Sequence, residues 1–145
     1  EQNGIQFKLI AGEAFNRKSG VPVYSKLYMI EIKSKSKQKL TIGEHLYGES
    51  GLYILEGGVD SGGNVYGPKQ MLVTKDGHLC EFTIHEKSTL YIFGGEPFPE
   101  ERFIDWNFVS SSKEKIEEAK QKWKIQSFEK IEGDETDYIP YPTLT

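Results

Sequence analysis

Few side chains in this sequence could bind a metal or attack a substrate. Its histidines are His45, His78 and His85, and its single cysteine is Cys80. His45 and Tyr47 are one residue apart, a spacing that places both side chains on one face of a strand. An imidazole that converges with further ligands could hold Fe, Mn, Ni or Zn and leave one position open for substrate. His45 is therefore a weak candidate metal ligand, and no register supplies a complete ligand set.

The remaining reactive groups have simpler interpretations. His78 lies in a glycine-containing turn and His85 ends a predicted strand, so both are expected to be solvated. Cys80 alternates with Phe82 and Ile84, which is typical of a small buried hydrophobe rather than of a reactive thiol. No serine lies on a nucleophile elbow. Paired catalytic carboxylates stay open, because several glutamates lie on or beside predicted strands.

Length and composition limit the class of protein. The chain has 145 residues, a formal charge of −4 and a pI near 5.5, which argues against a nucleic-acid partner and against attraction to anionic membranes. No apolar run approaches the roughly 20 residues that a membrane span needs. One cysteine excludes an intramolecular disulfide framework, so a reducing, cytoplasmic location is expected. The chain begins at Glu1, and we expect a processed product or a piece of something longer.

Short apolar runs between glycine-rich turns predict an all-β sandwich or barrel. In the run after Lys26, Tyr28, Ile30 and Ile32 share one face. The expected strands are Gln6–Ile10, Lys26–Ile32, Gln38–Ile42, Leu52–Glu56, Asn64–Tyr66, Gln70–Thr74, Leu79–Ile84 and Thr89–Phe93.

The last third of the chain predicts one short helix and an extended tail. Ser111 and Glu114 have the spacing of a capping box, and Ile116, Ala119 and Trp123 form a narrow apolar stripe. The acidic tail that follows is expected to be a surface strap, with a docking peptide as the alternative. We therefore expect a barrel over residues 1–109, and a helix and tail over 110–145 that pack on it.

Two motifs carry a family resemblance. Gly43-Glu44-His45-Leu46-Tyr47, followed by Leu55-Glu56-Gly57, resembles the first conserved motif of cupin barrels. Phe93-Gly94-Gly95-Glu96-Pro97, followed by Phe108-Val109 and a glutamate-rich helix, resembles the end of the C-terminal cupin domain of the pirin family. Trp106-Asn107 stands where that family usually has Gly-Pro.

The resemblance covers residues 7–125 and implies a cupin-type double-stranded β-helix, that is, a jelly-roll barrel. Pirin-family proteins have two such barrels, and the resemblance places the metal and the dioxygenase-like site in the N-terminal one. Measured against the cupin motifs, Tyr47 replaces a histidine, Ser50 takes the position of the acid and Ser88 that of the third histidine.

The resemblance therefore implies a metal-free C-terminal cupin domain with a structural or protein-interaction role beside an N-terminal cupin in the same chain. One alternative is a metal-dependent dioxygenase of the quercetin type, with Fe, Mn, Ni or Zn at a cryptic site. The other is a barrel that binds a small apolar ligand. Its candidate pocket residues are Tyr28, His45, Tyr47, Tyr53 and Phe82.

Overall fold

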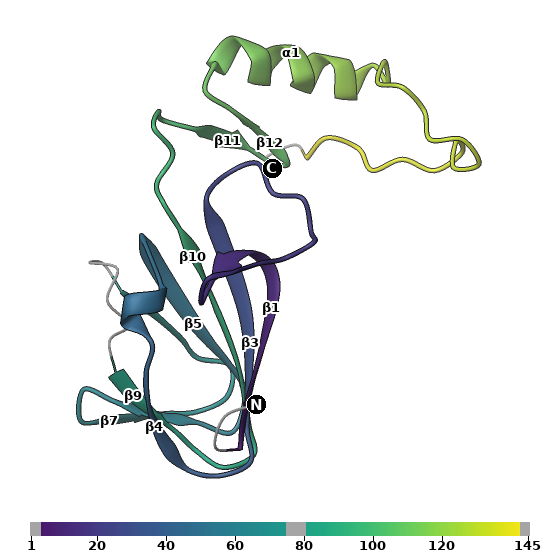
Figure 1. The fold of residues 1–145 in the computed structure, drawn as a ribbon. Coiled ribbons are helices and arrows are strands. Elements are labelled where there is room, and N and C mark those ends of the chain that lie inside the picture. The colour runs from purple at the N-terminus through teal and green to yellow at the C-terminus, as the bar shows by residue number, and fades with distance from the viewer. Residues whose placement is uncertain (1–3, 75–80, 143–145) are drawn as a thin grey trace. The chain divides into compact units, whose positions relative to one another are not determined.

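The computed structural model describes residues 4–74 and 81–142 and confirms the all-β architecture with one short C-terminal helix (Figure 1). The turn expected at 75–77, His78 and Cys80 lie outside the described residues. The elements are β1 (Ile5–Ala14), β2 (Arg17–Lys18), β3 (Leu27–Ser34), β4 (Gln38–Thr41), the 3-10 helix η1 (Gly43–His45), β5 (Glu49–Glu56), β6 (Val59–Ser61), β7 (Asn64–Tyr66), β8 (Met71–Thr74), β9 (Glu81–Ile84), β10 (Ser88–Gly95), β11 (Phe103–Asp105), β12 (Phe108–Ser110) and α1 (Lys113–Lys124).

The chain divides into two compact units, Glu1–Pro97 and Phe98–Thr145. The second unit takes in β11 and β12, because these strands pair with each other and contact α1. The expected assignment of residues 1–109 to the barrel, and the packing of the helix and tail on it, stay predictions.

Two antiparallel sheets build the first unit. The larger sheet has the strand order β2-β1-β3-β10-β5-β8, and the smaller has the order β4-β9-β6-β7. Strands that follow one another in the sequence are often not neighbours in a sheet, as in a jelly roll. For example, β3 belongs to the larger sheet and β4 to the smaller one. Figure 1 shows β1, β3, β10 and β5 running side by side.

Alternation along the strands directs one face of each sheet into a shared core. On β3, Tyr28, Ile30 and Ile32 are each at most 1% exposed, which confirms the face expected from the sequence. Leu52 and Ile54 of β5, Leu90 and Ile92 of β10, Val59 of β6, and Phe82 and Ile84 of β9 complete this core. The interior of the barrel is thus filled mainly by branched aliphatic side chains.

Gly94 shows why a glycine stands in the Gly-Gly-Glu-Pro segment. A Cβ atom at this position would lie 2.2 Å from the Glu49 carbonyl oxygen and 2.5 Å from the Tyr28 hydroxyl. Contacts this short do not occur in folded proteins, so only glycine lets β10 run this close to β5 and to the Tyr28 ring. The motif therefore positions a tyrosine inside the barrel.

The second unit is a β11–β12 hairpin covered by α1 and by the returning tail. A partly exposed cluster of aromatic rings holds these elements together, with neighbouring centroids 4.9–6.2 Å apart. The cluster consists of Trp106, Phe108, Trp123, Phe128 and Tyr141.

Helix α1 forms as expected, but its N-cap lies one residue later than the capping-box spacing predicts. Ser112, rather than Ser111, accepts a hydrogen bond at 3.2 Å from the Lys115 amide. The Ser112 hydroxyl also donates to Glu114 at 2.7 Å. The reciprocal hydrogen bonds of a capping box are therefore absent at the start of α1. Instead, the Ser112 hydroxyl both caps the Lys115 amide and binds the Glu114 carboxylate.

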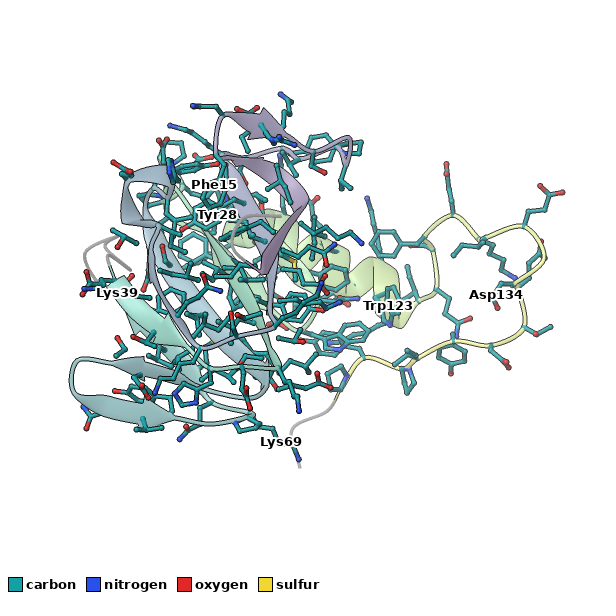
Figure 2. The ribbon with its side chains drawn as sticks, turned by 60° about the horizontal axis from the view of Figure 1, so that its bottom comes forward. Phe15, Tyr28, Lys39, Lys69, Trp123 and Asp134 are labelled. Atoms are coloured by element: carbon teal, nitrogen blue, oxygen red, sulfur yellow. The ribbon has the colours of Figure 1, made fainter. Side chains whose placement is uncertain are left out.

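The tail is held to the helix at a few points. The Trp123 indole donates to the Ile139 carbonyl at 2.7 Å, and Figure 2 shows its side chain directed toward the tail. The Tyr141 hydroxyl donates to Asp105. The side chains of Tyr138 and Ile139 are 64% and 68% exposed, so the strap is fastened by the Ile139 backbone and by Tyr141.

No helix within the described ranges is long and apolar enough to span a membrane.

Candidate functional site

His45 ends the 3-10 helix η1 rather than lying on a strand. Its side chain is 40% exposed, and Nε2 lies 3.8 Å from Oε1 of the neighbouring Glu44. Its ring packs on Phe15, with centroids 4.8 Å apart. Because the segment is helical, the spacing rule that placed His45 and Tyr47 on one strand face does not apply. The imidazole is therefore partly exposed and is not a member of the core.

Tyr28 and Tyr47 do come together. Their rings make an edge-to-face contact with centroids 5.0 Å apart. The Tyr28 hydroxyl is bonded to Ser50 Oγ, and the Tyr47 hydroxyl lies 2.9 Å from the Leu27 carbonyl and 3.1 Å from that of Glu13. Burial raises the pKa of both phenols, and the Glu13 charge adds to the effect at Tyr47. Both shifts disfavour the phenolate, which is the form in which a tyrosine binds a metal.

The other two pocket candidates lie elsewhere. Tyr53 pairs across strands with Tyr91 and Met71, on the face of β5 opposite the buried Leu52. Phe82 is 2% exposed and belongs to the core. The structure thus brings Tyr28 and Tyr47 together, places His45 beside a hollow that Tyr47 also lines, and puts Tyr53 on the opposite face of β5. Ligand binding by these five residues stays a prediction.

The positions where a cupin would have an acid and a third histidine hold buried serines. Ser50 faces inward at 0% exposure, while Glu49 points out. Ser88 is 1% exposed; its hydroxyl accepts from the Gly58 amide at 3.0 Å and donates to the Gly58 carbonyl at 3.2 Å. Both hydroxyls are committed to hydrogen bonds within the protein.

These donors do not fit a metal ion. Fe, Mn, Ni and Zn sites in cupins need imidazole and carboxylate ligands that converge. Over residues 4–74 and 81–142, no group of three histidine, cysteine, aspartate or glutamate side chains is close enough to hold one. Within that part of the chain, His45 has only Glu44 beside it as a second donor.

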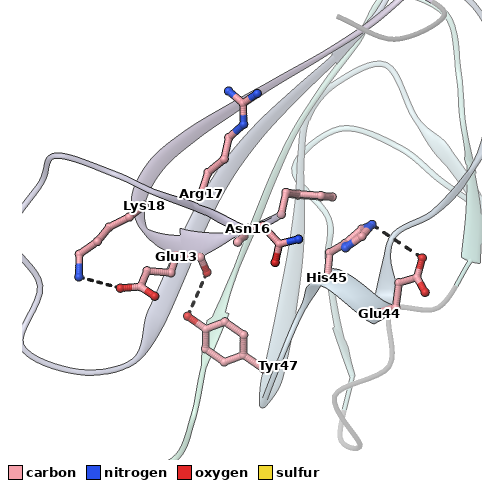
Figure 3. A pocket seen from close by; sticks show the side chains of 9 residues that line it. Glu13, Asn16, Arg17, Lys18, Glu44, His45 and Tyr47 are labelled. Atoms are coloured by element: carbon pink, nitrogen blue, oxygen red, sulfur yellow. Dashed lines mark hydrogen bonds and ion pairs between the residues drawn. The ribbon is translucent and has the colours of Figure 1, made fainter.

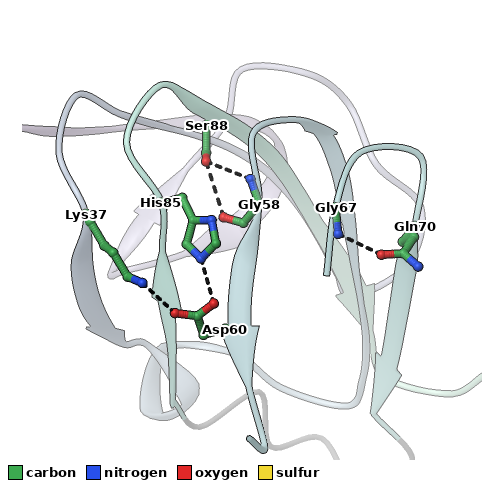
Figure 4. Close-up of polar contacts among 7 residues, drawn as sticks. All are labelled: Lys37, Gly58, Asp60, Gly67, Gln70, His85 and Ser88. Carbon is green, nitrogen blue, oxygen red and sulfur yellow. Dashed lines mark hydrogen bonds and ion pairs between the residues drawn. The ribbon is translucent and has the colours of Figure 1, made fainter. Parts of the chain in front are cut away.

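His85 was expected from the sequence to be solvated, but it belongs to a polar cluster centred on Asp60. His85 Nε2 lies 2.6 Å from Asp60 Oδ1, and Lys37 Nζ lies 2.8 Å from Asp60 Oδ2 (Figure 4). The hydrogen bond from Lys37, and then that from His85, hold the pKa of Asp60 below its usual value. The cluster was missed because it depends on the pairing of β6 with β9, which the sequence pattern does not specify.

Two hollows flank the turn between β1 and β2. The smaller, of about 340 Å³, is lined by Glu13, Glu44 and Tyr47 among others (Figure 3). The larger, of about 910 Å³, lies between β1 and β4. His45 lines both. The sequence signal for the larger hollow is weak: Phe7 and Leu9 alternate with Gln6 and Lys8, as they would on any half-buried strand.

Comparisons with known proteins agree with this geometry. Residues 28–129 match the model of the pirin C-terminal cupin domain family. A pirin-like protein of Caulobacter vibrioides is 40% identical over 142 residues, which is 98% of this chain and 49% of that protein. A Pseudomonas aeruginosa protein, named as a candidate quercetin 2,3-dioxygenase, is 29% identical over 98% of this chain and 47% of its own length. The chain spans about half the length of the curated relatives it matches.

A solved structure shares the fold. The crystal structure of a quercetin 2,3-dioxygenase from Acinetobacter baumannii superimposes with a TM-score of 0.80 at 24% identity. The match covers 100% of this chain and 50% of that one.

Proposed function

Because the chain belongs to the pirin C-terminal cupin domain family, we propose that it is a metal-free cupin domain with a structural and protein-interaction role beside an N-terminal cupin. The relatives are about twice as long as this chain, which supports a companion domain of similar size. In this proposal the companion barrel carries the metal chemistry.

One observation carries the proposal: Ser50 and Ser88 occupy the inward positions where ligands would be needed. Each has a hydroxyl already bonded inside the barrel. A neutral hydroxyl is a weak ligand for Fe, Mn, Ni or Zn beside imidazole and carboxylate. The aliphatic core around these serines gives a rigid scaffold rather than a reaction chamber.

The test is a metal titration of the chelator-treated chain. Fe(II), Mn(II), Ni(II) and Zn(II) are added in turn, with binding followed by calorimetry and by elemental analysis after desalting. The proposal expects less than about 0.1 equivalent of retained metal, no change between the wild type and His45→Ala, and no oxygen consumption with quercetin. A stoichiometric metal lost in His45→Ala would contradict it and would favour a dioxygenase site in this barrel.

A second arm tests the interaction role. An N-terminal pirin-type cupin barrel, supplied as a separate chain, is mixed with this one and examined by sedimentation velocity. A stable complex that forms without added metal supports the proposal. Absence of any complex up to about 1 mM, the effective concentration that a short flexible linker gives two domains of one chain, contradicts it.

A further inference from the structure

The hollow between β1 and β4, the β1–β4 groove, has the dimensions of a small-molecule site. Its volume of about 910 Å³ is comparable to that of typical ligand clefts. Phe7 and Leu9 from β1, and Leu40 from β4, are half-buried on its wall and pack against the core. All of its lining residues belong to the first unit, so one rigid scaffold supplies the whole site.

Phe15 lines this groove from a strained position. Phe15 and Asn16 form the two-residue turn between β1 and β2, with φ values of 52° and 55°. A left-handed backbone is unfavourable for a bulky side chain such as phenylalanine and persists only where the surroundings enforce it. Here the ring packs on Phe7 at 5.3 Å and on His45 at 4.8 Å. These ring contacts hold Phe15 in the left-handed conformation, with its side chain lining the groove.

The charges on the groove are cationic. Arg17, Lys18 and Lys39 line it, and no carboxylate does. Lys18 is paired with Glu13 at 2.7 Å and Lys39 with Glu81 at 2.6 Å, and neither acid lines the groove.

Arg17 is the unpaired cation among these residues. Its guanidinium has no ion pair or side-chain hydrogen bond to any residue that the structure describes. Figure 3 shows it directed away from the Glu13–Lys18 pair. A guanidinium presents a planar fork of N–H donors that matches a carboxylate. The whole chain carries a net charge of −4, so this cationic wall is a local feature.

We propose that the β1–β4 groove binds a small amphipathic monocarboxylate. The carboxylate forms a two-pronged hydrogen-bonded pair with Arg17, and the apolar ring or chain lies against Phe7, Leu9 and Leu40 under the Phe15 ring. This site does not depend on the structural role proposed above, and it needs no metal.

The probe is 4-phenylbutyrate, titrated by calorimetry into the chelator-treated full chain, with 4-phenyl-1-butanol as the matched neutral analogue. The expected result is saturable 1:1 binding of the acid and at least about tenfold weaker binding of the alcohol, because a charge-assisted bidentate pair is lost. Arg17→Gln should weaken binding of the acid by a similar factor. Lys8→Gln removes one positive charge from the face of β1 opposite Phe7 and Leu9, outside the groove lining, and should change nothing.

A groove-filling variant tests the location. Leu40→Trp places an indole in the groove and should abolish binding while leaving the circular dichroism spectrum unchanged. If that variant does not fold, amide shifts of the wild type on titration take its place, and they should concentrate at Phe7, Phe15, Arg17 and Leu40.

Four outcomes overturn the proposal: no saturable binding at millimolar acid, equal affinity for the alcohol, unchanged affinity in Arg17→Gln, or shifts confined to other surfaces. A dimer of this chain that Leu40→Trp disrupts would also overturn it, because the groove would then be an interface between copies.

Discussion

At the scale of single residues, the barrel interior tolerates few polar groups, and each has a partner. Within the described part of the chain, no buried side-chain nitrogen or oxygen lacks a hydrogen bond. The hydroxyls of Tyr28 on β3 and Ser50 on β5 are hydrogen-bonded to each other across Gly94 of β10, the strand between them. An unpaired hydroxyl in such a place costs free energy because it has lost its water without gaining a partner. The pair is therefore stabilising only while both members are present.

This mutual dependence predicts the effect of Tyr28→Phe. The change removes the partner of Ser50 and should lower the free energy of unfolding by about 1–2 kcal/mol. The double variant Tyr28→Phe with Ser50→Ala should recover part of that loss, and Tyr24→Phe, at a fully exposed position, should be neutral. Urea unfolding measures all of them. If the stability loss of the double variant equals the sum of the losses in Tyr28→Phe and Ser50→Ala, the two side chains are not energetically coupled, which would contradict this prediction.

Several of these residues were predictable and others were not. The two-residue period of strands correctly placed Tyr28 on an inward face, whereas Ser50 was singled out only by its position in the cupin motif. The same rule failed at His45, because Gly43–His45 forms a 3-10 helix and the rule holds only for strands. The Asp60–His85 contact joins two strands, and its partners depend on register, which a single sequence does not specify.

At the scale of elements, the local sequence pattern predicts the strands and the helix, but it does not predict the residues at which they begin and end. Two short hairpins were missed because their turns contain no glycine: Phe15-Asn16 joins β1 to β2, and Trp106-Asn107 joins β11 to β12. Trp106 adopts φ = 52°, a left-handed conformation that the glycine usual at this position in the family takes without strain. Packing of its ring on Trp123 offsets this cost.

The start of α1 gives a prediction that separates two neighbouring serines. Ser112→Ala should destabilise the helix start by about 1 kcal/mol, because the Lys115 amide loses its acceptor. Ser111→Ala should have almost no effect. Hydrogen exchange at the amides of residues 113–116 measures the difference: faster exchange is expected in the first variant only. Faster exchange in Ser111→Ala would contradict this prediction and would identify Ser111 as the N-cap, as the capping-box spacing predicts.

At the scale of the whole molecule, each unit contains an aspartate held ionised by cations. Asp60 in the first unit is bonded to Lys37 at 2.8 Å, and Asp105 in the second lies 3.1 Å from Lys120. The hydrogen bond from Tyr141, and then that from Lys120, lower the pKa of Asp105. Protons therefore bind these two carboxyls more weakly in the folded chain than in the unfolded one, and stability is linked to pH.

The sign of this linkage follows from the direction of the shifts. Both aspartates have folded pKa values below the ordinary 3.8, so their stabilisation is present above pH 3.8 and is lost as the pH falls through the lower folded values. The variant carrying Asp60→Asn and Asp105→Asn should be less stable than the wild type at pH 7. The gap should narrow below pH 4, because the wild type then loses the same ion pairs. Urea unfolding from pH 7 to pH 3 measures this gap in stability.

Both tryptophans lie in the second unit, so their fluorescence reports on Asp105, and circular dichroism reports on the whole chain. A gap that stays constant over this range would show that these carboxylates contribute by shape rather than by charge.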